Sequence, residues 1–303
     1  MKAVLLFPGQ GAQYTGMGRE LLETHPDAEK TFRAASDICG FDVQQLCLDG
    51  PEEKLSTTRW SQPCIFTLSW ALLDIFKTQC PDIEAVAVGG LSLGEYTACA
   101  AAGVFTFEEA VLLVKKRGEA MEEAATVNTG TMAGIIGLDR KTVEDICSAI
   151  EDVWPANINS AEQIVISGTP EGVHSAAEAA KAKAAKRVIP LKVSGAFHSP
   201  MMQPAADSLK EALDSTTFQT PNLPVLSNAL AALQTDPASI QGALLKQLTS
   251  PVRWVECVEC IRDQSEPDII IEFGPGKVLK GLIRRIDREL VVRNIEKPED
   301  CSR

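Results

Sequence analysis

The sequence contains little histidine, no excess of positive charge and no long apolar run. Only three of its 303 residues are histidine, and 29 Lys and Arg face 41 Asp and Glu, which gives a formal net charge of -12. This charge argues against nucleic acid as a general partner, because phosphate binding needs a positive field. The N-terminal apolar run ends at Pro8-Gly9, too early for a signal peptide, and no stretch reaches membrane-spanning length. We therefore expect a soluble, cytoplasmic protein without a nucleic-acid or membrane partner.

Nine cysteines are scattered along the chain without the spacing of a disulfide framework. An odd number without regular spacing is typical of a reducing compartment, where cysteines stay as thiols. The one close pair, Cys257 and Cys260, has no second cysteine pair or paired histidines to complete a zinc site. We therefore expect no metal and no permanently bound cofactor.

Short apolar and β-branched runs alternate with longer segments of helical periodicity, which predicts an α/β sheet covered by helices. The expected strands are residues 2–7, 84–88, 221–227 and 268–273. The expected helices are residues 16–22, 62–77, 95–102 and 107–125.

The segment 126–194 has a different character and predicts a small subdomain inserted into the main domain. Strands are expected at residues 131–138, 164–167 and 187–193, with helices at 141–150 and 170–185. The main domain would then be discontinuous, because residues 1–125 and 195–303 would form one unit.

Ser92 lies between Gly90 and Gly94, directly after an apolar strand and before a helix-forming segment. This G-x-S-x-G pattern is that of a nucleophile elbow, in which the backbone turns so sharply at the serine that only glycine fits two residues away. The turn exposes the hydroxyl at a helix N-terminus, whose free N–H groups suit a developing oxyanion. The alternative is a strand–helix turn with an incidental serine.

A nucleophilic serine needs a base, and only three histidines are available. His25 and His174 lie in polar helical segments and are expected at the surface. His198 lies in an irregular segment where the chain leaves the insertion, and catalytic groups concentrate on such connections. No Asp or Glu stands in an obvious triad setting, so a backbone carbonyl is expected to orient the imidazole.

Arg117 lies on the apolar face of the predicted helix 107–125, in line with Val114 and Met121. A buried guanidinium needs an anion, and its planar fork of donors matches a carboxylate in a bidentate pair. An arginine at the edge of the apolar seam, or an internal salt bridge, would produce the same pattern. Both interpretations stay open on the spacing alone.

Five motifs, in this order, resemble those of the malonyl-coenzyme A:acyl carrier protein transacylases. They are FPGQG at 7–11, GLSLGEY at 90–96, RG at 117–118, GAFHSP at 195–200 and EFGPGKVL at 272–279. The resemblance extends from residue 1 to about residue 295. It implies an α/β-hydrolase-like core with an inserted ferredoxin-like subdomain, which agrees with the small unit expected at 126–194.

The resemblance implies a role for each of the principal residues. Ser92 would be acylated by malonyl-CoA, with His198 as general base and then general acid, before the malonyl group passes to the phosphopantetheine thiol of an acyl carrier protein in a ping-pong reaction. Arg117 would bind the free malonyl carboxylate. The backbone N–H groups of Gln10 and Leu93 would form the oxyanion hole.

The resemblance also implies supporting residues. Those expected to line the acyl pocket are Gln62, Met121 and Phe197. The carbonyl of Gln247 would orient the histidine, and Asn157 and Asn159 fall where the family carries an asparagine-rich turn. Leu91 departs from the family pattern, because most members have a histidine beside the nucleophile. This difference can alter the polarity around the serine, the rate or the acyl preference.

The implied product supplies extender units for fatty acid or polyketide synthesis, and family members usually act as monomers. Two other functions must be weighed. A thioesterase or other hydrolase would use Ser92 and His198 with water as the second nucleophile, but neutral acyl chains would leave the charge of Arg117 unpaired. A noncatalytic carrier-protein docking module would have no need to keep these three residues together.

Overall fold

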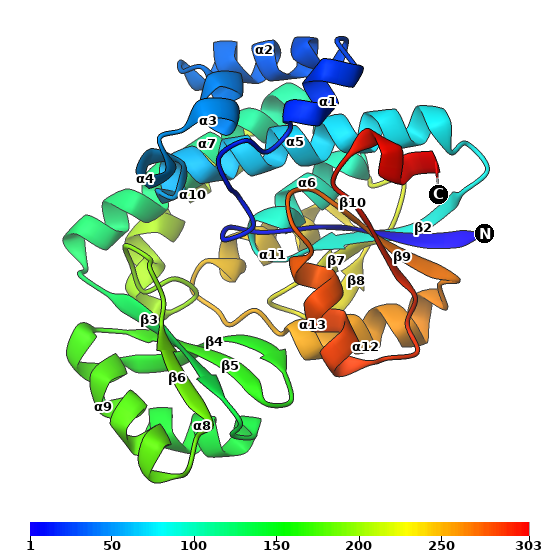
Figure 1. The fold of residues 1–303 in the computed structure, drawn as a ribbon. Coiled ribbons are helices and arrows are strands. Elements are labelled where there is room, and N and C mark those ends of the chain that lie inside the picture. The colour runs from blue at the N-terminus through cyan, green and yellow to red at the C-terminus, as the bar shows by residue number, and fades with distance from the viewer. Residues whose placement is uncertain (303) are drawn as a thin grey trace.

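Two β-sheets organise the computed structural model, which describes residues 1–302 (Figure 1). The large sheet has the strand order β10-β9-β1-β2-β7-β8, and the small sheet has the order β4-β5-β3-β6. The strands are β1 (Lys2–Phe7), β2 (Glu84–Gly90), β3 (Thr131–Ile136), β4 (Val153–Ser160), β5 (Gln163–Gly168), β6 (Arg187–Pro190), β7 (Val225–Ser227), β8 (Ala232–Gln234), β9 (Ile269–Phe273) and β10 (Val292–Ile295). The chain is thus a mixed α/β protein, as the sequence predicted.

Helices pack around both sheets. The α-helices are α1 (Arg19–Thr24), α2 (Ala28–Cys39), α3 (Val43–Asp49), α4 (Glu52–Leu55), α5 (Thr58–Gln79), α6 (Leu93–Ala101), α7 (Phe107–Val127), α8 (Arg140–Ser148), α9 (Pro170–Ala182), α10 (Gln203–Ser215), α11 (Pro237–Gln247), α12 (Trp254–Ser265) and α13 (Val278–Ile286). Short 3₁₀ turns occur at Pro200–Met202 and Pro298–Ser302. Among residues 1–302, no helix combines the length and the apolar character that crossing a membrane would require.

The large sheet is buried on both faces, and β1 illustrates how. Leu5 and Phe7 belong to a core that includes α5, α6 and α7, whereas Val4 and Leu6 belong to a second core with α12 and α13. Successive side chains of a strand point to opposite faces, so one apolar strand serves both cores. β1 pairs in parallel with β2 and with β9, and parallel sheets are covered by crossover helices in this way.

The carboxyl ends of β1, β2 and β7 meet at one edge of the large sheet. Phe7 and Gly90 are register partners in the parallel pair β1–β2, and β7 pairs in parallel with β2. The segments that carry Gln10, Ser92 and Asn228 therefore leave the sheet side by side. In open α/β sheets, ligands bind beyond this edge.

The small sheet is antiparallel and has its own core. Its elements follow the chain order β3-α8-β4-β5-α9-β6, and α8 and α9 lie together at the lower left of Figure 1. Ile135, Val143, Ile164 and Ala176 are among the residues of a hydrophobic cluster confined to this part of the chain, apart from Val255, which packs against it.

Strand β4 corrects the sequence-based expectation of three strands in this segment. It contains Pro155, Asn157 and Asn159, and both residue types are depleted in strands, which hides the strand in the sequence. β4 lies at the edge of the small sheet, where proline is tolerated. Asn157 and Asn159, expected in a turn, consequently lie in a strand.

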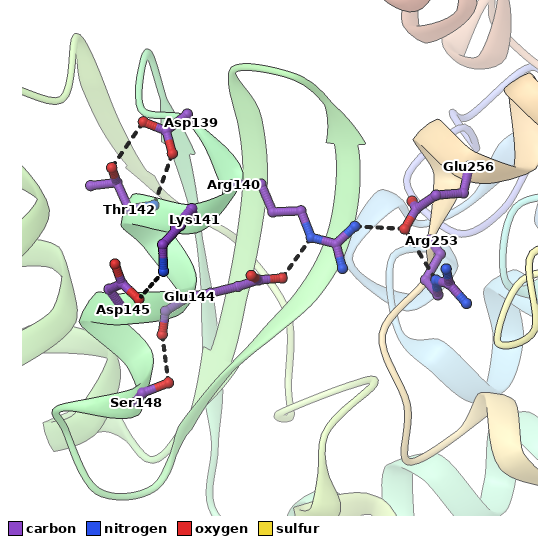
Figure 2. A network of polar contacts seen from close by, with 9 residues as sticks. All are labelled: Asp139, Arg140, Lys141, Thr142, Glu144, Asp145, Ser148, Arg253 and Glu256. Carbon is purple, nitrogen blue, oxygen red and sulfur yellow. Dashed lines mark hydrogen bonds and ion pairs between the residues drawn. The ribbon is translucent and has the colours of Figure 1, made fainter.

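The two sheets are joined through β4 and α8. Val252 donates its N–H to the carbonyl of Ala156 at 2.8 Å, and its own carbonyl accepts the N–H of Ile158 at 2.9 Å. Beside this bridge, Arg140 of α8 pairs with Glu256 of α12 at 2.5 Å (Figure 2). The small sheet is therefore held by backbone and ionic contacts to the segment that follows α11.

Several element bounds differ from those expected. The helix expected at 16–22 begins at Arg19, because Gly16 and Gly18 have φ angles of 98° and 81°, outside the helical region. The helices expected to begin at 62 and 95 begin at Thr58 and Leu93, and the strand expected at 187–193 ends at Pro190.

Candidate active site

Ser92 lies on a sharp turn between β2 and α6. Its φ of 53° and ψ of -103° are strained for a residue with a side chain. The turn is closed by the N–H of Gly94, which donates to the carbonyl of Leu91 at 3.0 Å, and by the N–H of Glu95, which donates to the carbonyl of Ser92 at 3.1 Å. Strain at such a position is kept only when the surroundings hold it.

The glycines on either side of Ser92 have no room for a side chain. A Cβ on Gly90 would lie 2.2 Å from the carbonyl carbon of Gly94, and a Cβ on Gly94 would lie 2.0 Å from the carbonyl oxygen of Phe7. The prediction that only glycine fits at both positions is confirmed. The packing of α6 onto β1 and β2 thus depends on this pair.

His198 lies within hydrogen-bond distance of the Ser92 hydroxyl. Its Nε2 is 2.9 Å from Ser92 Oγ, and its Nδ1 is 2.9 Å from the carbonyl oxygen of Gln247. Because a carbonyl only accepts, Nδ1 carries the proton and Nε2 is left free to accept from the serine. The Gln247 carbonyl thus occupies the place that a carboxylate holds in a catalytic triad.

The environment of His198 keeps its imidazole neutral. Burial, together with the nearby charge of Arg117, lowers the pKa of His198 to about 4, although the bond to the Gln247 carbonyl opposes both effects. A neutral imidazole is the form that accepts a proton from a serine.

Arg117 reaches the same hydroxyl from α7. Its Nη2 donates to Ser92 Oγ at 3.0 Å and to Gln247 Oε1 at 2.8 Å, and its Nη1 donates to Gln62 Oε1 at 2.8 Å. The residue is buried, and burial lowers the pKa of its guanidinium. Within residues 1–302 Arg117 forms no ion pair, and the oxygen atoms that accept from its buried guanidinium are neutral. Such an arrangement suits an incoming anion.

The residues expected to line a pocket lie beside these three. Gln62 Nε2 donates to Met121 Sδ at 3.4 Å, so the amide links Arg117 to Met121. Phe197 is buried and directly precedes His198. Gln62 therefore lies between Arg117 and Met121, and Phe197 is the chain neighbour of His198.

Gln10 and Leu93 lie in the segments that follow β1 and β2 at the same sheet edge. Gln10 follows β1, and its Nε2 donates to Thr58 Oγ1 at 3.1 Å. Leu93 is the first residue of α6, where backbone N–H groups have no partner within the helix. Leu91, beside the nucleophile, packs against the core formed with α12 and α13.

The other two histidines lie elsewhere. His25 is half-buried, and its ring makes exposed contacts with Thr24 and Gln79. His174 is exposed on α9, as expected.

Two residues at the site had no role in the sequence analysis. Asn228 follows β7, and its Oδ1 accepts the N–H of Ser92 at 2.6 Å while its Nδ2 donates to the carbonyl of Gly90 at 2.7 Å. Glu95 is buried on α6, and its Oε2 accepts the N–H of Asn228 at 3.0 Å. Asn228 follows an expected strand at the edge that carries Ser92, and this position was the signal that could have identified it.

A family model identifies the class of protein to which this chain belongs. Residues 4–296 match the family model described as the acyl transferase domain. The chain therefore contains an acyl transferase domain.

Curated relatives narrow this class. The malonyl CoA-acyl carrier protein transacylase of Bacillus subtilis is 42% identical over 98% of this chain and 94% of its own length. The transacylase of the same name from Escherichia coli K12 is 41% identical over 97% and 95% of the two chains. The chain belongs to the family of malonyl CoA-acyl carrier protein transacylases.

Solved structures have the same fold. The malonyl CoA-acyl carrier protein transacylase of Coxiella burnetii superposes with a TM-score of 0.95 at 39% identity, covering 99% of this chain and 96% of that one. A malonyl-transacylase in complex with its type II polyketide synthase acyl-carrier protein superposes with a TM-score of 0.96 at 38% identity, covering 100% and 98%. The resemblance inferred from five sequence motifs is confirmed.

Proposed function

We propose that this protein transfers a malonyl group from malonyl-CoA to the phosphopantetheine thiol of an acyl carrier protein, through a malonyl ester on Ser92. The observation that carries the proposal is the triangle of Ser92, His198 and Arg117, in which both the imidazole and the guanidinium contact one hydroxyl. The names of the curated relatives and the carrier-protein complex of a structural neighbour support the same substrates.

In the first half-reaction, Ser92 Oγ attacks the thioester carbonyl of malonyl-CoA while its proton passes to His198 Nε2. The N–H groups of Gln10 and Leu93 stabilise the oxyanion of the tetrahedral intermediate. The C–S bond then breaks, and the imidazolium returns its proton to the leaving CoA sulfur. A low pKa makes this imidazolium a strong acid toward a thiolate, whose ordinary pKa is about 8.5.

The second half-reaction reverses these steps with a different thiol. The phosphopantetheine thiol of the carrier protein gives its proton to His198 and attacks the malonyl ester. Collapse of the second tetrahedral intermediate returns the proton to Ser92 Oγ and releases malonyl-carrier protein. Because CoA leaves before the carrier protein reacts, the kinetics are ping-pong.

Arg117 selects the malonyl group in this proposal. Its guanidinium, held by the neutral oxygens of Gln62 and Gln247, can bind the free carboxylate of malonate in a bidentate pair. An acetyl group offers no such partner. A hydrolase for neutral acyl chains would leave this charge buried without an anion, and a docking module would need neither the nucleophile nor its base.

The family resemblance also implies a domain architecture, an oligomeric state and a compartment. We infer an α/β-hydrolase-like core at residues 1–125 and 195–303 and a ferredoxin-like insertion at 126–194, which the β3-α8-β4-β5-α9-β6 order supports. We also infer a monomer in the cytoplasm, without a permanent cofactor; all nine cysteines are unpaired, which suits a reducing compartment.

Intact-mass measurement tests the proposal. Mixing the protein with malonyl-CoA should add one malonyl group, peptide mapping should place it on Ser92, and a carrier protein bearing phosphopantetheine should remove it. The Ser92→Ala variant should gain no mass, whereas Ser69→Ala, at another buried serine, should be acylated like the wild type. No adduct on the wild type, or an acetyl adduct formed equally fast, would reject the proposal.

A further inference from the structure

Glu95 is a buried carboxylate that the proposed reaction does not use. It lies one turn after Ser92 on α6 and is 2% exposed. Burial raises the pKa of Glu95 to about 7, against the opposing bonds from Asn228 and Gln247 and the charge of Arg117. Burying a carboxylate costs free energy unless hydrogen bonds compensate for the lost water. The contacts of Glu95 therefore indicate which neighbouring groups it holds in place.

One oxygen of Glu95 accepts from both Asn228 and Gln247. Oε2 accepts the backbone N–H of Asn228 at 3.0 Å and the Nε2 of Gln247 at 2.6 Å. Since both partners are N–H donors, Oε2 is an acceptor whether or not the other oxygen carries a proton. Glu95 therefore offers Gln247 an acceptor in either charge state.

The side-chain amide of Gln247 lies between Glu95 and Arg117. Its Nε2 donates to Glu95 Oε2 and, at 3.0 Å, to the carbonyl of Ser92, while its Oε1 accepts from Arg117 Nη2 at 2.8 Å. A guanidinium has only donors, so it needs the amide oxygen on its side. If the Gln247 amide were flipped, its NH₂ would face the Arg117 guanidinium, which has only donors. Its oxygen would then face two acceptors, Glu95 Oε2 and the carbonyl of Ser92.

We propose that Glu95 is a positioning residue that fixes the orientation of the Gln247 amide and thereby holds Arg117 in place to receive the malonyl carboxylate. The substrate named here rests on the proposed function, whereas the orientation of the amide does not. Gln247 also holds His198 through its backbone carbonyl, so one residue links Glu95 to both partners of the Ser92 hydroxyl.

Removing the acceptor should release the amide. In Glu95→Leu, a side chain of similar size lacks the oxygen, so the Gln247 amide is free to turn its NH₂ toward Arg117. The guanidinium then loses one of its two carbonyl partners and moves. Malonyl transfer depends on that guanidinium and acetyl transfer does not, so the ratio of their kcat/KM values should fall about tenfold or more, the worth of a hydrogen bond to a charged group.

Two further variants at position 95 test whether the acceptor oxygen, the charge or the length of the side chain matters. Glu95→Gln keeps an oxygen for the two donors, so its malonyl-to-acetyl ratio should stay close to that of the wild type. Glu95→Asp keeps the charge but is one methylene shorter and cannot reach both donors, so its ratio should fall, with a higher KM for malonyl-CoA and little change in kcat.

Glu272 provides a matched control. It is also buried and also accepts two N–H groups, in this case both from the backbone, of Leu279 at 2.8 Å and of Lys280 at 3.0 Å, at the start of α13. Glu272→Leu removes the same group and should lower the melting temperature, yet it should leave the malonyl-to-acetyl ratio unchanged. A fall of the malonyl-to-acetyl ratio in Glu95→Leu but not in Glu272→Leu would therefore not be explained by a general loss of stability.

The outcomes separate this proposal from the proposed function. A wild-type ratio in folded Glu95→Leu would overturn the proposal, and if that variant does not fold, a wild-type ratio in Glu95→Asp would do so. Crystal structures of the wild type and Glu95→Asp add a readout independent of activity: the contact between Gln247 Oε1 and Arg117 Nη2 should be lost in the variant. Its retention would overturn the proposal, whereas absence of any malonyl adduct on the wild type would reject the function alone.

Discussion

Arginine and glutamate side chains interact directly in one region of this protein and through a glutamine amide in another. Between α8 and α12, Arg140 and Arg253 contact Glu256 directly at 2.5 and 3.1 Å (Figure 2), with side chains between 22% and 44% exposed. At the Ser92 elbow, Arg117 and Glu95 are both buried and a glutamine amide separates them. Burial, rather than residue type, distinguishes the two regions.

The difference determines what each charge can do. An exposed ion pair contributes about 0–1 kcal/mol, because water competes for both groups. Loss of one partner of a buried pair costs about 3–5 kcal/mol, because the other charge is left without compensation. At the elbow, Gln62 and Gln247 accept from Arg117 without neutralising it, so its charge is still available for a substrate carboxylate.

The largest effect is expected from the base in the buried region. His198→Ala should slow acylation by malonyl-CoA by about 10²- to 10⁴-fold, because the serine loses its proton acceptor. Rapid-quench intact-mass measurements give this rate. His174→Ala, on the exposed face of α9, should acylate at the wild-type rate, and a similar loss in both variants would contradict the assignment.

A smaller effect is expected from Asn228. Asn228→Ala leaves the N–H of Ser92 and the carbonyl of Gly90 without their partners, at a cost of about 1–3 kcal/mol for each buried group. Malonyl and acetyl transfer should fall together, since the elbow rather than Arg117 is disturbed. Thermal unfolding and both acylation rates test this.

Asn294 serves as the control for Asn228. It is buried, and its Nδ2 donates to the carbonyl of Gly276 at 2.8 Å, away from the Ser92 contacts. Asn294→Ala should lower stability while each folded molecule keeps full activity. A change in acyl preference in Asn228→Ala would show that its role is not confined to the elbow.

The pH dependence of kcat/KM distinguishes a buried His198 from an exposed histidine with an ordinary pKa. The base works when neutral, and the pKa of His198 is lowered to about 4, so kcat/KM for malonyl-CoA should stay level until the pH approaches that value. A limb near pH 6.5, the ordinary histidine value, would contradict this. Since the unfolded chain takes up the proton first, His198 also lowers stability as the pH falls from 6.5 to about 4.

The smallest effect is expected in the exposed network. Glu256→Gln removes the charge that Arg140 and Arg253 share, which should cost about 1 kcal/mol or less and should shrink further in high salt. Burial raises the pKa of Glu256, but the bonds from these arginines outweigh it and hold the pKa below its ordinary value. This contribution to stability is therefore present at neutral pH and is lost as the pH falls through that lowered pKa. Urea unfolding at two salt concentrations measures it, and a loss of acylation would contradict the separation of the two regions.

Local patterns explain what the sequence could predict. The elbow at Ser92 follows from two glycines between a strand and a helix, and His198 follows from the scarcity of histidine. Arg117 was identified by its helical phase with Met121. The inferences for Ser92 and Arg117 need only residues close together in the chain, and that for His198 needs the composition; in the structure His198 and Arg117 both contact the Ser92 hydroxyl.

Long-range contacts explain what the sequence could not predict. Glu95 contacts Asn228 and Gln247, which are 133 and 152 residues away, and no local periodicity encodes such contacts. Strand β4 was missed because it owes its place to pairing with β5 and to the bridge at Val252, rather than to the strand propensity of its proline and asparagines.

The acyl preference of Arg117→Ala tests the central claim most directly. Rates of Ser92 acylation by malonyl-CoA and by acetyl-CoA are measured for the wild type and the variant. The account predicts that malonyl acylation falls about 100-fold or more while acetyl acylation is kept or improved, because only the malonyl carboxylate needs the guanidinium. An equal fall in both rates would mean that Arg117 holds the site together and does not select the substrate.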